Sequence, residues 1–136
     1  MLEFPKMKEV AVEFTVDAAG FALLCSVQPM GDDCIIALRG GDKAHIGSTA
    51  MAVPRPSLTG VGRSATVSTL NRTGHKDDFL ANPIAHAVAA RLDCAVTCVA
   101  GVHVDDATPE QIAAIQAAVP TVIDRVCAMP KEASDE

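Results

Sequence analysis

Apolar and polar residues alternate along the first half of the chain, and this alternation has the period of half-buried β-strands. Five such runs are separated by short turns rich in Gly, Pro and Asp, at residues 10–16, 21–27, 34–39, 45–53 and 64–71. Connections this short favour antiparallel neighbours, because a parallel crossover needs a dozen residues or more. The first four strands are therefore predicted to form a meander.

The pattern changes to helical spacing in the second half. Leu80, Ile84, Val88 and Leu92 recur at the helical period, and we predict that Asn82 caps this helix, with residues 77–81 forming a turn before it. Residues 94–104 are apolar throughout, which is typical of a central strand buried on both faces.

A second helix start is marked by the run Thr-Pro-Glu-Gln at 108–111. It offers a threonine cap, a proline at the first helical position and a glutamine three residues on, which together make a capping box. The apolar stripe continues to Val126, so Pro120 is predicted to kink this helix without ending it. We predict an α+β fold, an antiparallel sheet with two helices packed on it, in a single domain of residues 1–136 with a polar tail from 131.

The predicted fourth strand has small residues on both faces, among them Gly47, Ser48 and Ala50. A glycine inside a strand often marks the close approach of a backbone or a ligand. A tightly packed helix and a ligand explain this pattern equally well.

Composition narrows the function classes. The chain of 136 residues is 49% hydrophobic and carries a net charge of -6, with four Phe and neither Trp nor Tyr. An acidic chain without large aromatic platforms is a poor candidate for binding nucleic acid. Five cysteines without a signal peptide indicate reduced thiols and a cytoplasmic protein, and no apolar run is long enough to span a membrane.

Positive charge is concentrated in residues 39–76. This stretch contains six of the eleven Lys and Arg, six of the nine Gly and one carboxylate, so its charge is +5 while the rest of the chain carries -11. Such a composition is typical of loops that close around an anion, although solvated turns would share it. The candidate ligand-binding residues within it are Arg39, Gly40, Gly41, Lys43, His45, Gly47, Arg55, His75 and Lys76. Arg55 is the most constrained of them, because it lies between Pro54 and Pro56.

Two acidic pairs are harder to interpret. Asp77 and Asp78 follow the basic stretch and can interact with the helix dipole themselves, which weakens the case for an anion at that helix start. His103 precedes Asp105 and Asp106, and this grouping fits a metal ligand, a general base or ordinary turn residues.

Four segments together resemble a known family. They are residues 40–47 (GGDKAHIG), 52–57 (AVPRPS), 74–78 (GHKDD) and 100–108 (AGVHVDDAT). They resemble the small D-subunit-like proteins associated with gallate decarboxylase, which are described as prenylated-flavin chaperones with a domain like that of the proteasome assembly chaperones. The resemblance extends from about residue 40 to 115.

The resemblance implies a carrier, not an enzyme. Such a protein would accept prenylated flavin mononucleotide, or flavin mononucleotide, from a flavin prenyltransferase and deliver it to a decarboxylase of aromatic hydroxy acids. It also implies a homodimer. From the residues themselves, Arg39, Lys43, Arg55 and Lys76 are the expected clamp for the flavin phosphate.

Two hypotheses from other classes remain open. The chain could be a structural assembly factor that binds no ligand and uses its basic stretch to dock an acidic partner. Alternatively, His45, His75 and His103 could hold a metal in a small hydrolase or lyase, although their spacing matches no common ligand signature.

Overall fold

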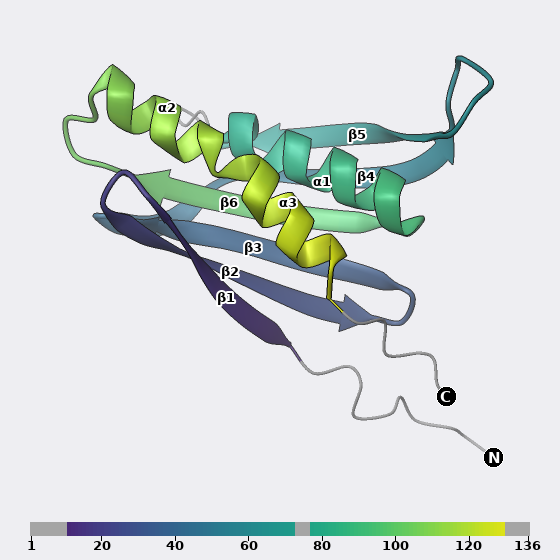
Figure 1. Cartoon of the computed structure of the whole chain (residues 1–136), viewed down its shortest axis with the longest axis horizontal. Coiled ribbons are helices and arrows are strands. Elements are labelled where there is room, and N and C mark those ends of the chain that lie inside the picture. The colour runs from purple at the N-terminus through teal and green to yellow at the C-terminus, as the bar shows by residue number, and fades with distance from the viewer. Residues whose placement is uncertain (1–10, 73–76, 130–136) are drawn as a thin grey trace.

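Six strands and three helices make up most of the computed structural model, which describes residues 11–72 and 77–129. The strands are β1 (Val12–Ala18), β2 (Phe21–Met30), β3 (Asp33–Gly41), β4 (Lys43–Pro56), β5 (Arg63–Asn71) and β6 (Val96–His103). The helices are α1 (Asp78–Leu92), α2 (Pro109–Ala117) and α3 (Val119–Cys127), and they lie on one side of the sheet (Figure 1). The α+β class and the antiparallel pairing of most strands are confirmed.

The order of strands in the sheet is β1-β2-β3-β6-β4-β5. The prediction of a four-strand meander is therefore wrong at one step, because β6 lies between β3 and β4. The short turn between these strands crosses the end of β6: Gly41 and Lys43 both pair with His103, and the Asp42 N–H donates to the His103 carbonyl. A short connection fixed the antiparallel directions of β3 and β4, but it did not force them to be neighbours.

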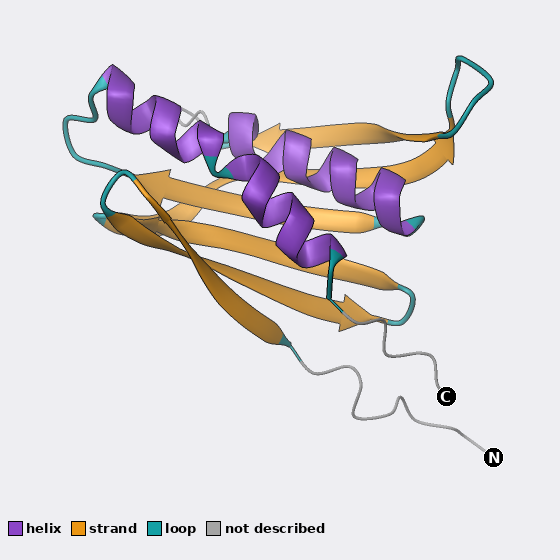
Figure 2. Ribbon diagram, viewed as in Figure 1, coloured by secondary structure: helices purple, strands orange, loops and turns teal. Residues whose placement is uncertain are grey.

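Burial alternates along β1, β2 and β3 as the sequence predicts. The prediction that β6 is buried on both faces is wrong, because its buried residues alternate with partly exposed ones. Leu23, Cys25 and Val27 of β2 face the helices and are buried, as are Ile36 and Leu38 of β3. Apolar residues of α1 pack on β4, β5 and β6, and α3 packs against α1 and crosses over the half of the sheet formed by β1 to β3 (Figure 1). Together they close the core on that face. The opposite face of the sheet has no helix over it in the described part of the chain (Figure 2).

Helix α1 begins earlier than the sequence predicts. Asp77, not Asn82, occupies the cap position, so Pro83 lies inside the helix. The prediction placed proline at the first helical position, where its missing N–H costs nothing. Burial overrides that preference, because the earlier start carries the buried Leu80 and Ala81 onto the core.

The second helical segment is broken, not kinked. The capping box of Thr108 and Gln111 is present as predicted, but α2 ends at Ala117 and α3 begins at Val119. Pro120 has no N–H to donate to a residue four positions back, and it is tolerated in the first turn of a new helix. The two helices together take the place of the second helix that the sequence predicts.

The five cysteines are free thiols, as the sequence predicts. Burial raises the pKa of Cys25 and of Cys34 to about 12, and it raises the pKa of Cys98 as well. Burial therefore makes these thiols weak nucleophiles near neutral pH. Among the described helices, none is long and apolar enough to cross a membrane.

Candidate functional site

The N-terminal end of β4 is irregular where it pairs with β6. Ala44 lies opposite Val102 and Ser48 lies opposite Ala100, so three residues of β4 face only Gly101. This bulge reverses the alternation of β4: Ile46 is exposed before it, whereas Ala50 and Ala52 are buried after it. Strict alternation over residues 45–53 predicts that His45 and Gly47 share a face with Met51 and Val53. This prediction is wrong, because the bulge places His45 and Gly47 on the buried side, against Asp77.

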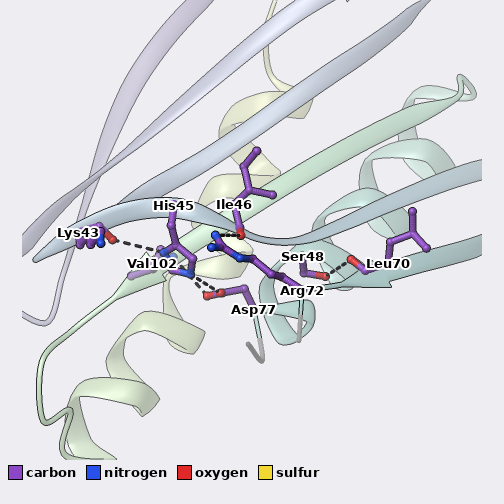
Figure 3. A network of polar contacts seen from close by, with 8 residues as sticks. All are labelled: Lys43, His45, Ile46, Ser48, Leu70, Arg72, Asp77 and Val102. Carbon is purple, nitrogen blue, oxygen red and sulfur yellow. Dashed lines mark hydrogen bonds and ion pairs between the residues drawn. The ribbon is translucent and has the colours of Figure 1, made fainter. Parts of the chain in front are cut away.

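The bulge turns His45 inward, toward the start of α1 (Figure 3). Its Nε2 lies 3.1 Å from Oδ2 of Asp77, and the two side chains are only 10% and 8% exposed. The other carboxylate oxygen of Asp77 accepts the backbone N–H of Val102 at 3.3 Å. Asp77 thus joins β4, β6 and α1, and its side chain makes no cap hydrogen bond with the helix it precedes.

Glycines at this end of the sheet are explained by close packing. A Cβ on Gly47 would overlap the Asp77 carboxylate, and one on Gly101 would overlap the His45 carbonyl. A Cβ on Gly41 would overlap the His103 carbonyl, and one on Gly40 would press on Leu23. The sequence-based expectation that something packs closely on β4 is confirmed at Gly47. The neighbour of Gly47 is Asp77, the residue immediately before α1. Close packing within the protein therefore explains these glycines without a ligand.

His103 and Asp105 form a second, more exposed pair beside the first. His103 Nε2 lies 2.9 Å from Asp105 Oδ1, and the Asp105 backbone N–H donates to the Asp42 carboxylate at 2.8 Å. The rings of His45 and His103 are edge to face with centroids 6.3 Å apart. These contacts tie the end of β6 to the turn before β4, which favours the turn interpretation of this pair.

A metal site is not supported by the described residues, among which no group of three His, Cys, Asp or Glu side chains is arranged to hold an ion. The hypothesis of three histidines also required His75, which lies outside the described residues, as does Lys76.

Arg39 is engaged on the face of the sheet that the helices leave uncovered. It donates to Ser26 Oγ at 3.0 Å and lies 3.5 Å from the Glu13 carboxylate. Its charge is therefore already balanced by an acidic neighbour on β1. Lys43 is exposed at the start of β4, beside His103.

Arg55 lies at the opposite end of β4. A shallow pocket of about 570 Å³ is present there, between the base of the β4–β5 hairpin and the C-terminal end of α1. Its lining residues are Pro54, Arg55, Pro56, Gly62, Arg63, Ala90 and Asp93. The Arg55 guanidinium is oriented by hydrogen bonds to Thr66 Oγ1 at 3.0 Å and to the Pro56 carbonyl at 3.1 Å.

Arg63, the second cation of this pocket, binds the C-terminal end of α1. It donates to the carbonyls of Ala90 and Arg91, and it lies 3.7 Å from the Asp93 carboxylate. A cation on the last carbonyls of a helix satisfies their hydrogen-bonding capacity and the negative end of the helix dipole. Arg55 is therefore the pocket cation whose charge no described carboxylate balances through an ion pair.

The structure does not bring the expected phosphate clamp together. At about 3.3 Å per residue, the strand from Lys43 to Arg55 spans roughly 35–40 Å. One phosphate cannot contact both residues within a single chain. The candidate residues fall into two groups: Arg39, Gly40, Gly41, Lys43, His45 and Gly47 at one end of the sheet, and Arg55 at the other.

Sequence reasoning missed the role of Asp77 and the contribution of Arg63 and Asp93 to the pocket. Gly47 was the sequence feature that indicated a close contact on β4, because a glycine inside a strand often marks a close neighbour. The structure shows that this neighbour is the Asp77 carboxylate. Nothing local in the sequence indicates that Arg63 reaches α1, since that contact depends on how the hairpin packs on the helix.

Comparison with known proteins identifies a family and similar proteins. Residues 17–131 match the model of the prenylated flavin chaperone LpdD-like domain. Protein LpdD of Lactiplantibacillus plantarum (strain ATCC BAA-793 / NCIMB 8826 / WCFS1) is 33% identical over 103 residues, which are 74% of this chain and 71% of that protein.

A solved structure described as a novel chaperone complex for yeast 20S proteasome assembly is similar in fold. The TM-score is 0.52 at 10% sequence identity, over 86% of this chain and 91% of the other. At that identity the similarity concerns the fold alone, and it agrees with the architecture expected from the resemblance. The family match covers most of the chain and the LpdD match exceeds 30% identity, so the chain belongs to the prenylated flavin chaperone LpdD-like family.

Proposed function

We propose that this protein binds prenylated flavin mononucleotide without transforming it and delivers it to a prenylated-flavin-dependent decarboxylase of aromatic hydroxy acids. A flavin prenyltransferase would supply the cofactor. The observation that carries the proposal is the family match over residues 17–131. The buried, weakly nucleophilic thiols are compatible with a role that involves no covalent chemistry.

The Arg55 pocket is the better of the two ends for the flavin. Its lining includes Arg55, Pro54 and Pro56, and the chain offers no Trp or Tyr against which the flavin ring could stack instead. Arg55 is held between two prolines and by two hydrogen bonds, so it loses little conformational entropy when it binds an anion.

The opposite end is less suited to a phosphate dianion. The carboxylates of Asp42, Asp77 and Asp105 lie at this end. The space beside its glycines is already occupied by atoms of neighbouring residues. Like charge near a phosphate raises the cost of binding it. Lys43 and Arg72 are the exposed cations of the described residues at this end, and the Arg72 guanidinium already donates to the Ile46 carbonyl. Lys43 is therefore the residue chosen for the competing variant in the test.

The test removes one cation at each end. Arg55→Ala and Lys43→Ala proteins are titrated with flavin mononucleotide by flavin fluorescence, and each is co-expressed with a flavin prenyltransferase and analysed by mass spectrometry. We expect Arg55→Ala to weaken flavin binding about 10- to 100-fold, the cost of losing charge-assisted hydrogen bonds. Lys43→Ala is expected to bind like the wild type.

The reverse result, in which Lys43→Ala weakens binding and Arg55→Ala does not, would move the flavin to the His45 end. A wild-type protein that takes up no flavin, prenylated or not, would contradict the carrier function and favour the assembly factor. Because the two substituted residues are far apart on one strand, each variant also serves as the charge-matched control for the other.

A further inference from the structure

The turn that joins β4 and β5 holds two large apolar side chains in solvent. Leu58 is 91% exposed and Val61 is 81% exposed, the highest values among the exposed large hydrophobic residues of the described chain. We call residues 57–62 the hairpin tip. Figure 1 shows that it extends beyond the helices at one corner of the molecule. Neither side chain contributes to the core, so folding does not explain their hydrophobicity.

The hairpin tip is internally bonded. Ser57 N–H donates to the Gly62 carbonyl and Gly60 N–H donates to the Ser57 carbonyl, both at 3.0 Å. The hydroxyls of Ser57 and Thr59 lie 2.9 Å apart, and the Thr59 hydroxyl also bonds the carbonyl and the N–H of Val61. The backbone is thus fixed by its own polar groups, and the apolar side chains are presented outward at little further cost in entropy.

The stretch of sequence that contains the hairpin tip carries only positive charges. From Lys43 to Arg72 the chain has four Lys and Arg and no carboxylate, a charge of +4, while the net charge of the whole chain is -6. Arg55 and Arg63 flank the tip on its two strands. Arg63 is paired with Asp93, so Arg55 is the arginine beside the tip whose charge no described carboxylate balances. An apolar centre with such a cation beside it is complementary to an apolar hollow rimmed by carboxylates.

The hairpin tip is continuous with the Arg55 pocket. Pro54, Arg55 and Pro56 immediately precede the tip, Gly62 is its last residue and Arg63 follows it. All five residues line the pocket. A surface that contacts a partner at the tip therefore places the pocket next to that partner.

We propose that the hairpin tip is the docking surface for the decarboxylase that receives the flavin, with Leu58 and Val61 inserted into an apolar hollow rimmed by carboxylates. This inference rests on the proposed carrier function. Docking at the tip would bring the pocket against the recipient before the flavin leaves, so the cofactor would not have to pass through bulk solvent.

The experiment separates docking from flavin binding. Binding of the flavin-free protein to a flavin-free, prenylated-flavin-dependent decarboxylase is measured by interferometry, and flavin mononucleotide binding is measured separately. The variants are Leu58→Ser, the double variant Leu58→Ser/Val61→Ser, and the matched control Leu70→Ser, in which an exposed leucine lies at the other end of β5. None of these residues lines the pocket.

We expect the double variant to bind the decarboxylase at least tenfold more weakly, as expected for truncation of anchors at the centre of an interface. Flavin binding of all variants and decarboxylase binding of Leu70→Ser should equal those of the wild type. Raising the salt concentration should weaken docking of the wild type, because cations flank the tip.

Equal decarboxylase binding by the wild type and the double variant would overturn the proposal, as would a wild type that does not bind the decarboxylase at all. So would tip-dependent binding to vesicles of phosphatidylserine and phosphatidylcholine, or tip-dependent self-association, without decarboxylase binding. Failure of the wild type to bind flavin, with docking intact, would instead contradict the carrier function and leave the docking surface supported.

Discussion

Gly47 and Asp77 show how one side chain determines the residue allowed at another position. The Asp77 carboxylate occupies the space of a Cβ at Gly47, and it bonds His45 and the Val102 N–H. Because His45 and Asp77 are almost fully buried, moving the carboxylate would leave polar groups unsatisfied away from water.

This contact predicts a strong coupling between two substitutions. Gly47→Ala should lower the free energy of unfolding by about 1–3 kcal/mol through steric overlap, and Asp77→Ala by about 1–3 kcal/mol through lost hydrogen bonds. The double variant should be less destabilised than the sum by about 1 kcal/mol or more, because no carboxylate remains to clash. Urea denaturation of the four proteins measures the coupling.

The control cycle replaces Asp77 with its neighbour. The three atoms nearest a Cβ at Gly47 all belong to Asp77 and none to Asp78, so Gly47→Ala and Asp78→Ala should add within about 0.5 kcal/mol. Additivity in both cycles would show that the overlap at Gly47 is relieved without cost and that Asp77 does not restrict that position.

At the scale of elements, Pro83 lies inside a helix whereas Pro120 lies at the start of one. Pro83 lies five residues into α1, where its missing N–H leaves the Phe79 carbonyl without its helical partner. Pro120 lies in the first turn of α3, where that N–H has no helical acceptor to lose. The sequence shows both prolines, but only the helix starts decide which one is costly.

Replacing each proline with alanine should therefore give different results. Pro83→Ala is expected to raise the free energy of unfolding by about 1–3 kcal/mol, because it restores a helical hydrogen bond and relieves the clash of the ring. Pro120→Ala should change it by less than about 1 kcal/mol, and should lower it if the unfolded chain gains freedom. Thermal and urea unfolding measure both. Equal effects would contradict the observed start of α1.

The elements that the sequence predicted correctly are those determined by local sequence patterns. The β1–β2 hairpin and the capping box at Thr108 were predicted correctly, because alternation, turn residues and cap chemistry are local. The β4 bulge and the early start of α1 were not, because both depend on contacts with β6 and the core. The candidate residues were selected for their charge and glycine content, and that composition does not indicate that they divide between two ends of the sheet.

At the scale of the whole molecule, one face of the sheet has no helix over it in the described chain (Figure 2). Its residues on the central strands include Ile35, Val99 and Met51, and few are charged. With strands about 4.8 Å apart and 25–30 Å long, the face of six strands covers roughly 650 Å². A standard interface buries about 800 Å² per partner, so this face is close to the size that a second copy would cover.

The homodimer expected from the family resemblance is testable on this face. We expect the wild type to sediment as a dimer and Met51→Glu as a monomer, because a buried unpaired charge opposes association. Ile112→Glu, on α2, is the matched control, since Ile112 is 44% exposed and Met51 is 50% exposed. A monomeric wild type at tens of micromolar, or a dimeric Met51→Glu protein, would contradict the prediction.

The sequence by itself determined the fold class, the existence of most elements, the basic stretch and the family resemblance. Periodicity, cap chemistry and composition indicate the fold class, the elements and the basic stretch, and they are visible in residues close together in the chain. The resemblance is carried by four short segments. The tertiary structure alone decided that β6 separates β3 from β4, that His45 meets Asp77, and that Lys43 and Arg55 lie far apart. The physical reason is that burial and close packing act between residues distant in sequence, and they override local preference wherever the two conflict.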